Sequence, residues 1–463
     1  MAHRGRCPPL KKRRNATILL YLAAGALAAA FILVPPTAYG QLQVRKDPAG
    51  TVHLPGLSDP FAGSKLAYPI FAVSATILAV GILYWKKWLP AALSDVIRRI
   101  LCYEVSRRLA SAIIAAALAV YSGYVASDFY GKEEGDLENV ISNTEGFVEG
   151  LSGHVASLRV VKYFLLYLSL YGFGNIGVIP FLSGVALLVL IYLFTASVAK
   201  RRLAGLVAFF ALLQSPLYLR FDTSPTYDYA WITFYLLSLY LLTTKRGRYF
   251  SPVAFVLSLF SKPLTAAYIP MVLFFIWRAE MPHRDKLALA VPYGLMLFAL
   301  GAAAVFAGRE EIVILSPNAG LLTGMISTLP IYLGAEYLFW LSLLPVYCGL
   351  FLLGLKRTTY GQSMLFLFGG TLASYYILEG FTNISSQPYR FVPLVVVAAI
   401  GLGALLSHRF ENIPKSVFYR SVHVAVAALT APPAFLALAY VIFPTQMTAV
   451  INQLARAAGS LVR

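Results

Sequence analysis

The feature that most constrains this chain is a repeated alternation of long apolar segments with short charged ones. A membrane-spanning helix needs about 20 apolar residues to cross a hydrocarbon core about 30 Å thick, and the segments have this length. Only 13% of the 463 residues are charged, whereas a soluble domain carries about 25%. The sequence therefore predicts an all-α protein, a polytopic membrane helix bundle of about 13 transmembrane helices.

Several apolar segments carry this prediction. Among them are 174–198, 203–220, 288–307, 330–354, 363–381 and 418–443. Two shorter segments, 250–263 and 264–277, meet at Lys262–Pro263, where a proline interrupts the helical pattern. We expect this pair to be broken or tilted.

The distribution of basic residues predicts how the helices are oriented. If residue 1 lies in the cytoplasm, the inner segments hold 26 of the 38 Lys and Arg residues but only five of the 20 acids. The net charge is then +21 inside and −3 outside, as the positive-inside rule requires. This predicts a multi-pass protein of the cell membrane with a cytoplasmic N-terminus and a C-terminus outside. It also accounts for the net charge of +18 without a nucleic-acid partner.

Motifs of other protein classes are missing from the sequence. The three cysteines, Cys7, Cys102 and Cys348, are far apart and have neither disulfide-framework nor zinc-site spacing. Neither GxxxxGK[ST] nor HExxH occurs. A P-loop ATPase and a zinc protease are therefore not expected.

The predicted spans divide the chain into three parts. Residues 1–107 form an N-terminal extension of two membrane helices with an outer loop and a cytoplasmic amphipathic segment. Residues 108–407 form the membrane core, whose outward acidic loop covers 126–173. Residues 408–463 form a last span and an outward amphipathic tail. The apolar run after the basic stretch Lys11–Arg14 is either a cleaved signal sequence or a retained anchor.

The acidic loop is the first candidate site. It contains seven of the 20 acids: Asp128, Glu133, Glu134, Asp136, Glu138, Glu145 and Glu149. For most of them a solvated loop is the simpler interpretation. Carboxylates gathered at a membrane surface also provide a general base or hold a divalent cation, because packing like charges raises one pKa and favours a metal. The candidate ligands for Mg²⁺ or Mn²⁺ are Asp136 and Glu133, and no other cofactor is indicated.

Two helices are expected in this loop. Five residues are spaced by four, four, three and three positions, which places them on one face of a helix: Asp136, Val140, Thr144, Phe147 and Gly150. We expect Val140 and Phe147 to lie on the membrane, and Asp136 to begin the helix, where the helix dipole favours an anion. The apolar segment 158–171 is too short to span and predicts an interfacial helix.

Two basic residues at the outer ends of spans are the second candidate site. Lys262 stands among apolar residues, and Arg390 follows Tyr389 at the start of a late span. An ionisable group at such a depth is a functional hypothesis by default, although a long basic side chain also reaches the headgroups by snorkelling. Together the two cations would stabilise a lipid phosphate as a leaving group, while a carboxylate of the loop deprotonates an acceptor hydroxyl.

The order of these features resembles the GT-C superfamily of integral-membrane glycosyltransferases, which take sugars from polyprenyl-phosphate carriers. The resemblance covers about 108–407. It consists of the outward acid with its amphipathic helix, the helix ending in YGFG at 174, Asp228 at the head of a span, the element SLFSKPLTAAYIP and the element Tyr389-Arg390-Phe391-Val392-Pro393.

The resemblance implies roles for particular residues. The catalytic base would be Asp136, or in second place Asp128, and Lys262 and Arg390 would contact the phosphate or headgroup. Further substrate-binding candidates beside these elements are Tyr389, Asp228 and Glu134. The implied partners are a lipid-linked sugar donor and membrane lipids. Two other functions stay open: a non-catalytic subunit of a membrane complex, with the acidic loop as its docking surface, and a secondary transporter.

Overall fold

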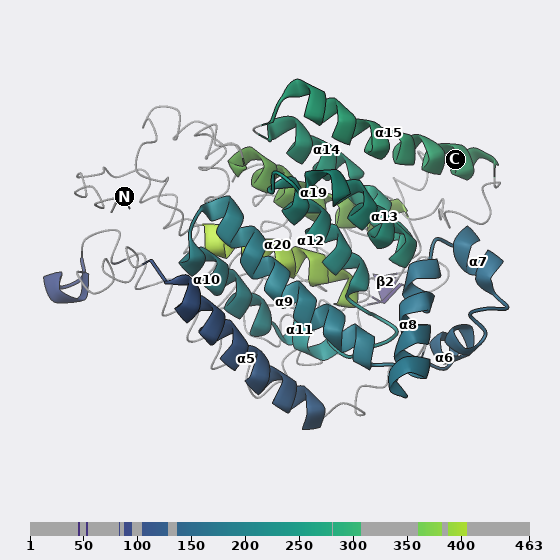
Figure 1. Ribbon diagram of the computed structural model, residues 1–463, viewed down its shortest axis with the longest axis horizontal. Coiled ribbons are helices and arrows are strands. Elements are labelled where there is room, and N and C mark those ends of the chain that lie inside the picture. Colours follow the sequence, from purple (N-terminus) through teal and green to yellow (C-terminus); the bar gives the residue numbers. More distant parts are fainter. Residues whose placement is uncertain are drawn as a thin grey trace.

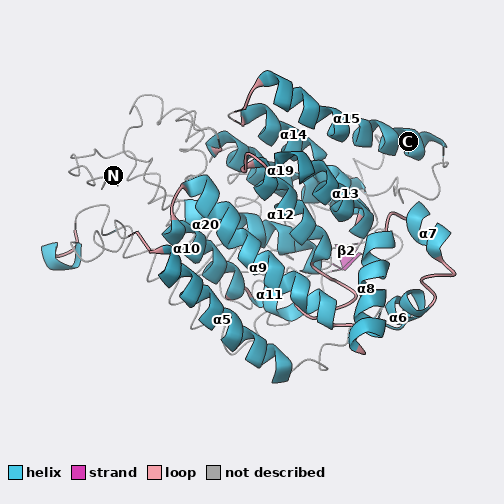
Figure 2. Ribbon diagram, viewed as in Figure 1, coloured by secondary structure: helices cyan, strands magenta, loops and turns pink. Residues whose placement is uncertain are grey.

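The computed structural model describes residues 45–46, 52–53, 83, 88–94, 104–127, 137–279, 281–306, 360–381 and 388–404. These residues are helical almost throughout (Figures 1 and 2), which confirms the prediction of an all-α protein. Beside the helices there is one antiparallel pair of two-residue strands, β1 (Arg45–Lys46) and β2 (Val52–His53). Most of the predicted segment 1–107 and all of 408–463 lie outside the described residues.

The described helices are α5 (Arg107–Ser127), α6 (Leu137–Glu145), α7 (Leu151–Ala156), α8 (Val160–Phe173), α9 (Val178–Ala199), α10 (Arg202–Leu213), α11 (Pro216–Phe221), α12 (Ala230–Leu242), α13 (Ser251–Ser261), α14 (Ile269–Arg278), α15 (His283–Phe306), α19 (Gly361–Phe381) and α20 (Val392–Ala404). Three 3₁₀ helices join them: η1 (Arg248–Phe250), η2 (Pro263–Tyr268) and η3 (Pro388–Phe391).

The core forms around α9, which packs against α10, α12 and α20 (Figure 1). Both α9 and α20 are apolar on all sides, and such helices are stable only when other helices surround them. Close approach between α20 and its neighbours depends on Gly403. A Cβ atom at this position would collide with the carbonyl oxygen of Ala204 and lie 2.6 Å from Cγ2 of Thr195.

Prolines break the helices at two places. The apolar segment 203–220 forms α10 and α11 instead of one helix, because Ser215 and Pro216 start a new helix there. The Ser215 hydroxyl accepts a hydrogen bond from the Tyr218 backbone N–H at 3.1 Å, which is an N-cap. The second break, at Lys262–Pro263, agrees with the sequence prediction.

Charged turns connect the helices at one end of the bundle, called here the basic end. Glu104, which precedes α5, lies 3.6 Å from Arg201 and 3.8 Å from Arg202 in the turn between α9 and α10. Arg248 donates a 2.9 Å hydrogen bond to Asp285 at the start of α15. The Ser197 hydroxyl near the end of α9 donates a 3.0 Å hydrogen bond to the Thr243 hydroxyl after α12, so the turns that follow these two helices lie at the same end of the bundle.

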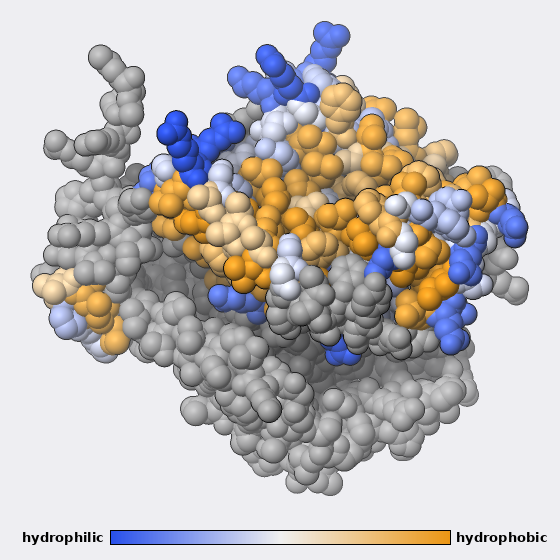
Figure 3. Space-filling model, turned by 60° about the horizontal axis from the view of Figure 1, so that its bottom comes forward, coloured by the Kyte–Doolittle hydropathy of each residue, from blue (hydrophilic) through white to orange (hydrophobic). Residues whose placement is uncertain are grey.

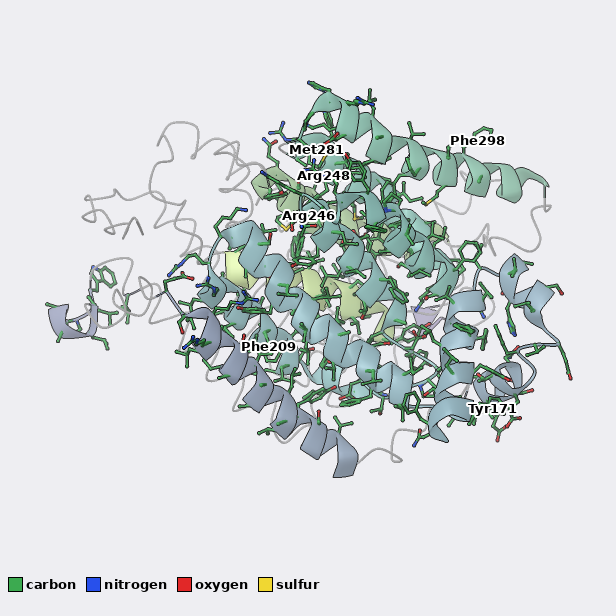
Figure 4. All side chains as sticks on the ribbon, in the orientation of Figure 1. Tyr171, Phe209, Arg246, Arg248, Met281 and Phe298 are labelled. Atoms are coloured by element: carbon green, nitrogen blue, oxygen red, sulfur yellow. The ribbon has the colours of Figure 1, made fainter. Side chains whose placement is uncertain are left out.

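The acidic loop and α8 lie at the opposite end, with Tyr171 far from Arg246 and Arg248 (Figure 4). In α6, Val140 and Thr144 are buried, as the helical spacing predicts. The expectation that Val140 and Phe147 lie on the membrane is wrong. Both pack against Tyr163 and Leu166 of α8, because contact between the apolar sides of the two segments removes both from water.

One described helix, α9, is long and apolar enough to cross a membrane. Five shorter apolar helical segments accompany it, over Val160–Phe173, Arg202–Leu213, Ala230–Leu242, Pro263–Arg278 and Val392–Ala404. The surface also carries large apolar side chains. Figure 3 shows a broad apolar face with hydrophilic residues near its margins.

Candidate functional site

The candidate site lies opposite the basic end, where α8, the α11–α12 loop, the α13–η2 junction and η3 meet. Lys262 occupies the junction between α13 and η2 with an extended backbone, at φ −152° and ψ 117°. The residue before a proline is pushed out of the helical region, and Pro263 follows Lys262. The break therefore turns Lys262 out of the helix axis and toward η3.

The Lys262 ammonium lies over two aromatic rings. Its Nζ atom is 4.4 Å from the centroid of the Tyr389 ring and 5.1 Å from that of the Trp231 ring. Cation–π contacts at such distances contribute about 0.5–2 kcal/mol each, depending on how far water is excluded. A lysine that only snorkels reaches toward water, whereas Lys262 is held against side chains of α12 and η3.

Tyr389 belongs to an aromatic cluster at this end of the bundle. The Tyr227 ring stacks on it, with centroids 3.9 Å apart and planes 19° apart. Phe221 packs edge-on against Tyr389 at 6.2 Å and against Tyr227 at 5.3 Å. The cluster thereby fixes the ring that Lys262 contacts.

Asp228 is a buried carboxylate in the loop before α12. Its Oδ1 atom accepts a hydrogen bond from the Ala230 backbone N–H at 3.0 Å, and its Oδ2 atom lies 3.9 Å from Nζ of Lys162 on α8. Lys162 also donates a 2.8 Å hydrogen bond to the carbonyl of Thr226. Burial raises the pKa of Asp228, while the positive charges of Lys162 and Lys262 act to lower it. The site thus combines one carboxylate with two ammonium groups.

A second buried carboxylate, Asp222, holds the loop that carries Tyr227 and Asp228. The Tyr121 hydroxyl of α5 donates a 2.8 Å hydrogen bond to Oδ2 of Asp222, which is fully buried. Further along the loop, the Tyr229 hydroxyl donates to the carbonyl of Tyr218 at 2.7 Å. These bonds fix both ends of the loop to α5 and α11.

Of the predicted site residues, Lys262, Tyr389 and Asp228 come together at this end. Arg390 lies next to Tyr389 in η3, but its side chain is outside the described part. Four other candidates also lie outside the described residues: Asp136, Asp128, Glu133 and Glu134. Within the described ranges, no three His, Cys, Asp or Glu side chains are grouped so that they could hold a metal ion.

Three residues of the site do not follow from the sequence reasoning. In the sequence, Lys162 is only a charged residue near the start of the predicted interfacial helix. Tyr227 precedes Asp228, and Trp231 follows it by about one helical turn, so both stand beside a residue that the pattern does single out. Their contacts with Lys262 and Tyr389 depend on which segments the fold brings together.

Comparison with known proteins adds no family to this description. No family model, curated protein or solved structure matches the chain.

Proposed function

We propose that this protein is a membrane glycosyltransferase, which moves a sugar from a polyprenyl-phosphate carrier to an acceptor at the non-cytoplasmic face. The proposal includes the polytopic GT-C-like architecture, with the basic end in the cytoplasm and the candidate site outside. It extends the resemblance seen in the sequence.

The surface of α15 supports the membrane location. Leu287, Val291, Leu295 and Phe298 repeat at steps of four, four and three and are all more than half exposed. Leu289 and Tyr293, on another side of the same helix, are buried. Water disfavours such a continuous apolar strip, and lipid accepts it.

The single observation that carries the proposal is the position of Lys262, held by the rings of Tyr389 and Trp231 next to Asp228. Ammonium groups bind phosphate oxygens. Aromatic faces and a carboxylate are the groups that bind the CH faces and hydroxyls of a sugar. An ammonium group, aromatic rings and a carboxylate therefore lie together at the end of the bundle that we propose to be outside. These groups suit a sugar phosphate whose lipid tail stays in the bilayer.

The chemistry is a substitution at the anomeric carbon. The acceptor hydroxyl oxygen attacks that carbon, the carbon–oxygen bond to the phosphate breaks, and the lipid phosphate leaves with the electron pair. The hydroxyl proton passes to a carboxylate, for which Asp136 is the first candidate and Asp128 the second. Lys262, together with Arg390, stabilises the negative charge of the leaving phosphate.

A divalent cation is compatible with this scheme. Mg²⁺ or Mn²⁺ held by Asp136 and Glu133 would neutralise phosphate charge. No step above requires it.

The test is release of lipid phosphate from polyprenyl-phosphate-linked sugars by the purified full-length protein, with a detergent extract of its native membranes added to supply the acceptor hydroxyl. Asp136→Asn should lower the rate by about 100-fold or more, the size of a general-base contribution. Glu138→Gln, a change at an exposed acid of α6, is the matched control and should leave the rate unchanged. Wild-type protein that binds the donor without releasing phosphate would instead be a non-catalytic subunit, and transport of the intact donor would indicate a transporter.

A further inference from the structure

Helices α14 and α19 run antiparallel to each other, and α14 ends at the basic end of the bundle. The Thr371 hydroxyl donates a 3.6 Å hydrogen bond to Sδ of Met271. Nearer the basic end, the rings of Phe274 and Phe366 stack with their centroids 4.4 Å apart. Passing from the first contact to the second leads forward along α14 and backward along α19. The last turn of α14 therefore lies beside the first turn of α19.

One helical turn beyond the stacked rings, each helix carries a polar side chain. Arg278 follows Phe274 by four residues and Ser363 precedes Phe366 by three, so each shares a helix face with its ring. Trp277, which is 69% exposed, packs edge-on against Phe274 at 6.1 Å. We call these five residues the α14–α19 patch.

Two polar atoms of the patch are buried. Nε of Arg278 and Oγ of Ser363 make no hydrogen bond in the part of the chain that the structure describes. Arg278 belongs to none of the ion pairs among these residues, and Asp285 of α15 is held by Arg248. Glu280 lies outside the described residues. Buried donors without an acceptor are costly, so the patch offers two donors to a ligand from outside the chain.

The surroundings of these donors favour an anion. The Lys286 ammonium donates a 2.7 Å hydrogen bond to the carbonyl of Trp277, so a second cation lies beside the patch. The first turn of α19, a helix of 21 residues, adds backbone N–H groups that have no partner inside the helix, at the positive end of its dipole. Guanidinium groups and helix N-termini both bind phosphate oxygens.

The aromatic rings indicate that this phosphate belongs to a lipid. Phe366 and Trp277 are exposed, and Leu287 begins the apolar strip of α15 after the same turn. Tryptophan is enriched at the boundary between headgroups and hydrocarbon. Basic sites between membrane helices on the cytoplasmic side bind anionic headgroups. A free phosphate would use the donors but leave the rings exposed.

We propose that the α14–α19 patch binds an anionic phospholipid, with its phosphate on Arg278 and the first turn of α19 and an acyl chain along Phe366 and Trp277. α14 follows η2 and α19 precedes η3, so the lipid would hold together the two helices next to Lys262 and Tyr389. The inference rests on the membrane location that is part of the proposed function. It does not depend on glycosyl transfer.

Native mass spectrometry of the full-length protein in detergent measures the affinity for added phosphatidylglycerol. Arg278→Gln should weaken binding by about 10- to 100-fold, because charged hydrogen bonds to the phosphate are lost. Arg108→Gln is the matched control. It removes an exposed cation of the same end on α5, which lies far from α14 in Figure 1, and should change the affinity by less than about 2-fold. Equal losses would show that only overall charge attracts the lipid and would overturn the proposal.

Two further variants test the ring and the nearby acid. Trp277→Ala should weaken binding by about fourfold, the contribution of roughly one buried methylene group. Its exposed side chain keeps the proposal testable should Arg278→Gln fail to fold, and unchanged affinity would overturn the acyl-chain contact. Glu280→Gln should not weaken binding. A loss as large as that of Arg278→Gln would show that an ion pair, and not a lipid, occupies the guanidinium.

Competing ligands identify the source of the phosphate. Excess inorganic phosphate should not displace phosphatidylglycerol, and displacement would make free phosphate the ligand. Phosphatidylcholine, whose headgroup is zwitterionic, should bind about 5-fold more weakly, and equal binding of the two lipids would contradict recognition of an anion.

The two proposals fail separately. Binding of phosphatidylglycerol that depends on Arg278, in a protein that releases no lipid phosphate from a polyprenyl-phosphate sugar, would remove the transferase and keep the lipid site. Sugar transfer by a protein whose Arg278→Gln variant binds the lipid normally would do the opposite.

Discussion

Lys162 and Asp228 meet across two elements that are far apart in the chain, with Nζ of the lysine 3.9 Å from Oδ2 of the aspartate. Both side chains are largely buried, at 14% and 9% exposure. The lysine also donates a hydrogen bond to Thr226 in the same loop. The pair therefore joins α8 to the loop that carries the aromatic cluster.

Replacing the lysine tests this connection. Lys162→Met should reduce the free energy of unfolding by about 1–3 kcal/mol, because a hydrogen bond from a charged group is lost and Asp228 stays buried. Thermal unfolding of the detergent-purified protein measures the loss. Arg159→Met changes an exposed cation just before the same helix and should alter stability by less than about 0.5 kcal/mol. Equal effects of the two changes would show that the pair contributes nothing specific.

The contact between Lys262 and Tyr389 predicts a dependence between the two side chains. Tyr389→Leu should weaken donor binding by about 2- to 30-fold, since a cation–π contact contributes about 0.5–2 kcal/mol. In a Lys262→Met background the same change should have a smaller effect, because only the contact between the ring and the sugar is then lost. A double-mutant cycle on the dissociation constant of a polyprenyl-phosphate sugar measures the coupling. Tyr389→Phe keeps the ring and should bind like the wild type, and additive effects of the two changes would contradict the contact.

Two buried tyrosines should differ in how removal of the hydroxyl changes the stability of the protein. Tyr121→Phe deletes the 2.8 Å hydrogen bond to Asp222 and should cost about 1.5–3 kcal/mol of stability. The Tyr235 hydroxyl is buried and has no hydrogen-bond partner among the described residues. Tyr235→Phe should therefore be neutral or stabilising. The melting temperatures of the two variants test the prediction. A larger decrease for Tyr235→Phe than for Tyr121→Phe would contradict these hydrogen-bond assignments.

Two glycines offer a matched pair in the packing of the bundle. Gly403→Ala should destabilise the protein by about 1–3 kcal/mol, because the new methyl group meets Ala204 and Thr195. Gly369→Ala, on α19, has open space around it and should be neutral or stabilise by up to about 1 kcal/mol. Unfolding midpoints of the two variants in the same detergent are the measurement. Similar midpoints would mean that α20 does not approach α10 as closely as described.

Helix positions were predictable wherever local rules determine them. The break at Lys262–Pro263 follows from proline geometry, and the buried face of α6 follows from helical spacing. What covers that face was not predictable, because periodicity distinguishes an apolar side from a polar one but not lipid from a neighbouring helix. Val140 and Phe147 therefore met α8 instead of the membrane.

Some residues of the candidate site could likewise be recognised in the sequence, and others only in the structure. Lys262 and Asp228 stand out in the sequence because a charge at the end of an apolar segment is costly to bury without a partner. Tyr389 stands out only as a neighbour of Arg390 in the element that carries the family resemblance. Only the tertiary structure decided that Lys162 pairs with Asp228 and that Tyr227 and Trp231 join the group, since these contacts link segments whose relative positions depend on packing of the whole bundle. The sequence by itself determined the helical class and the break at Lys262–Pro263, which arise from residues near one another in the chain. Partners distant in sequence became evident only in three dimensions, because nearly any apolar helix face can pack against another.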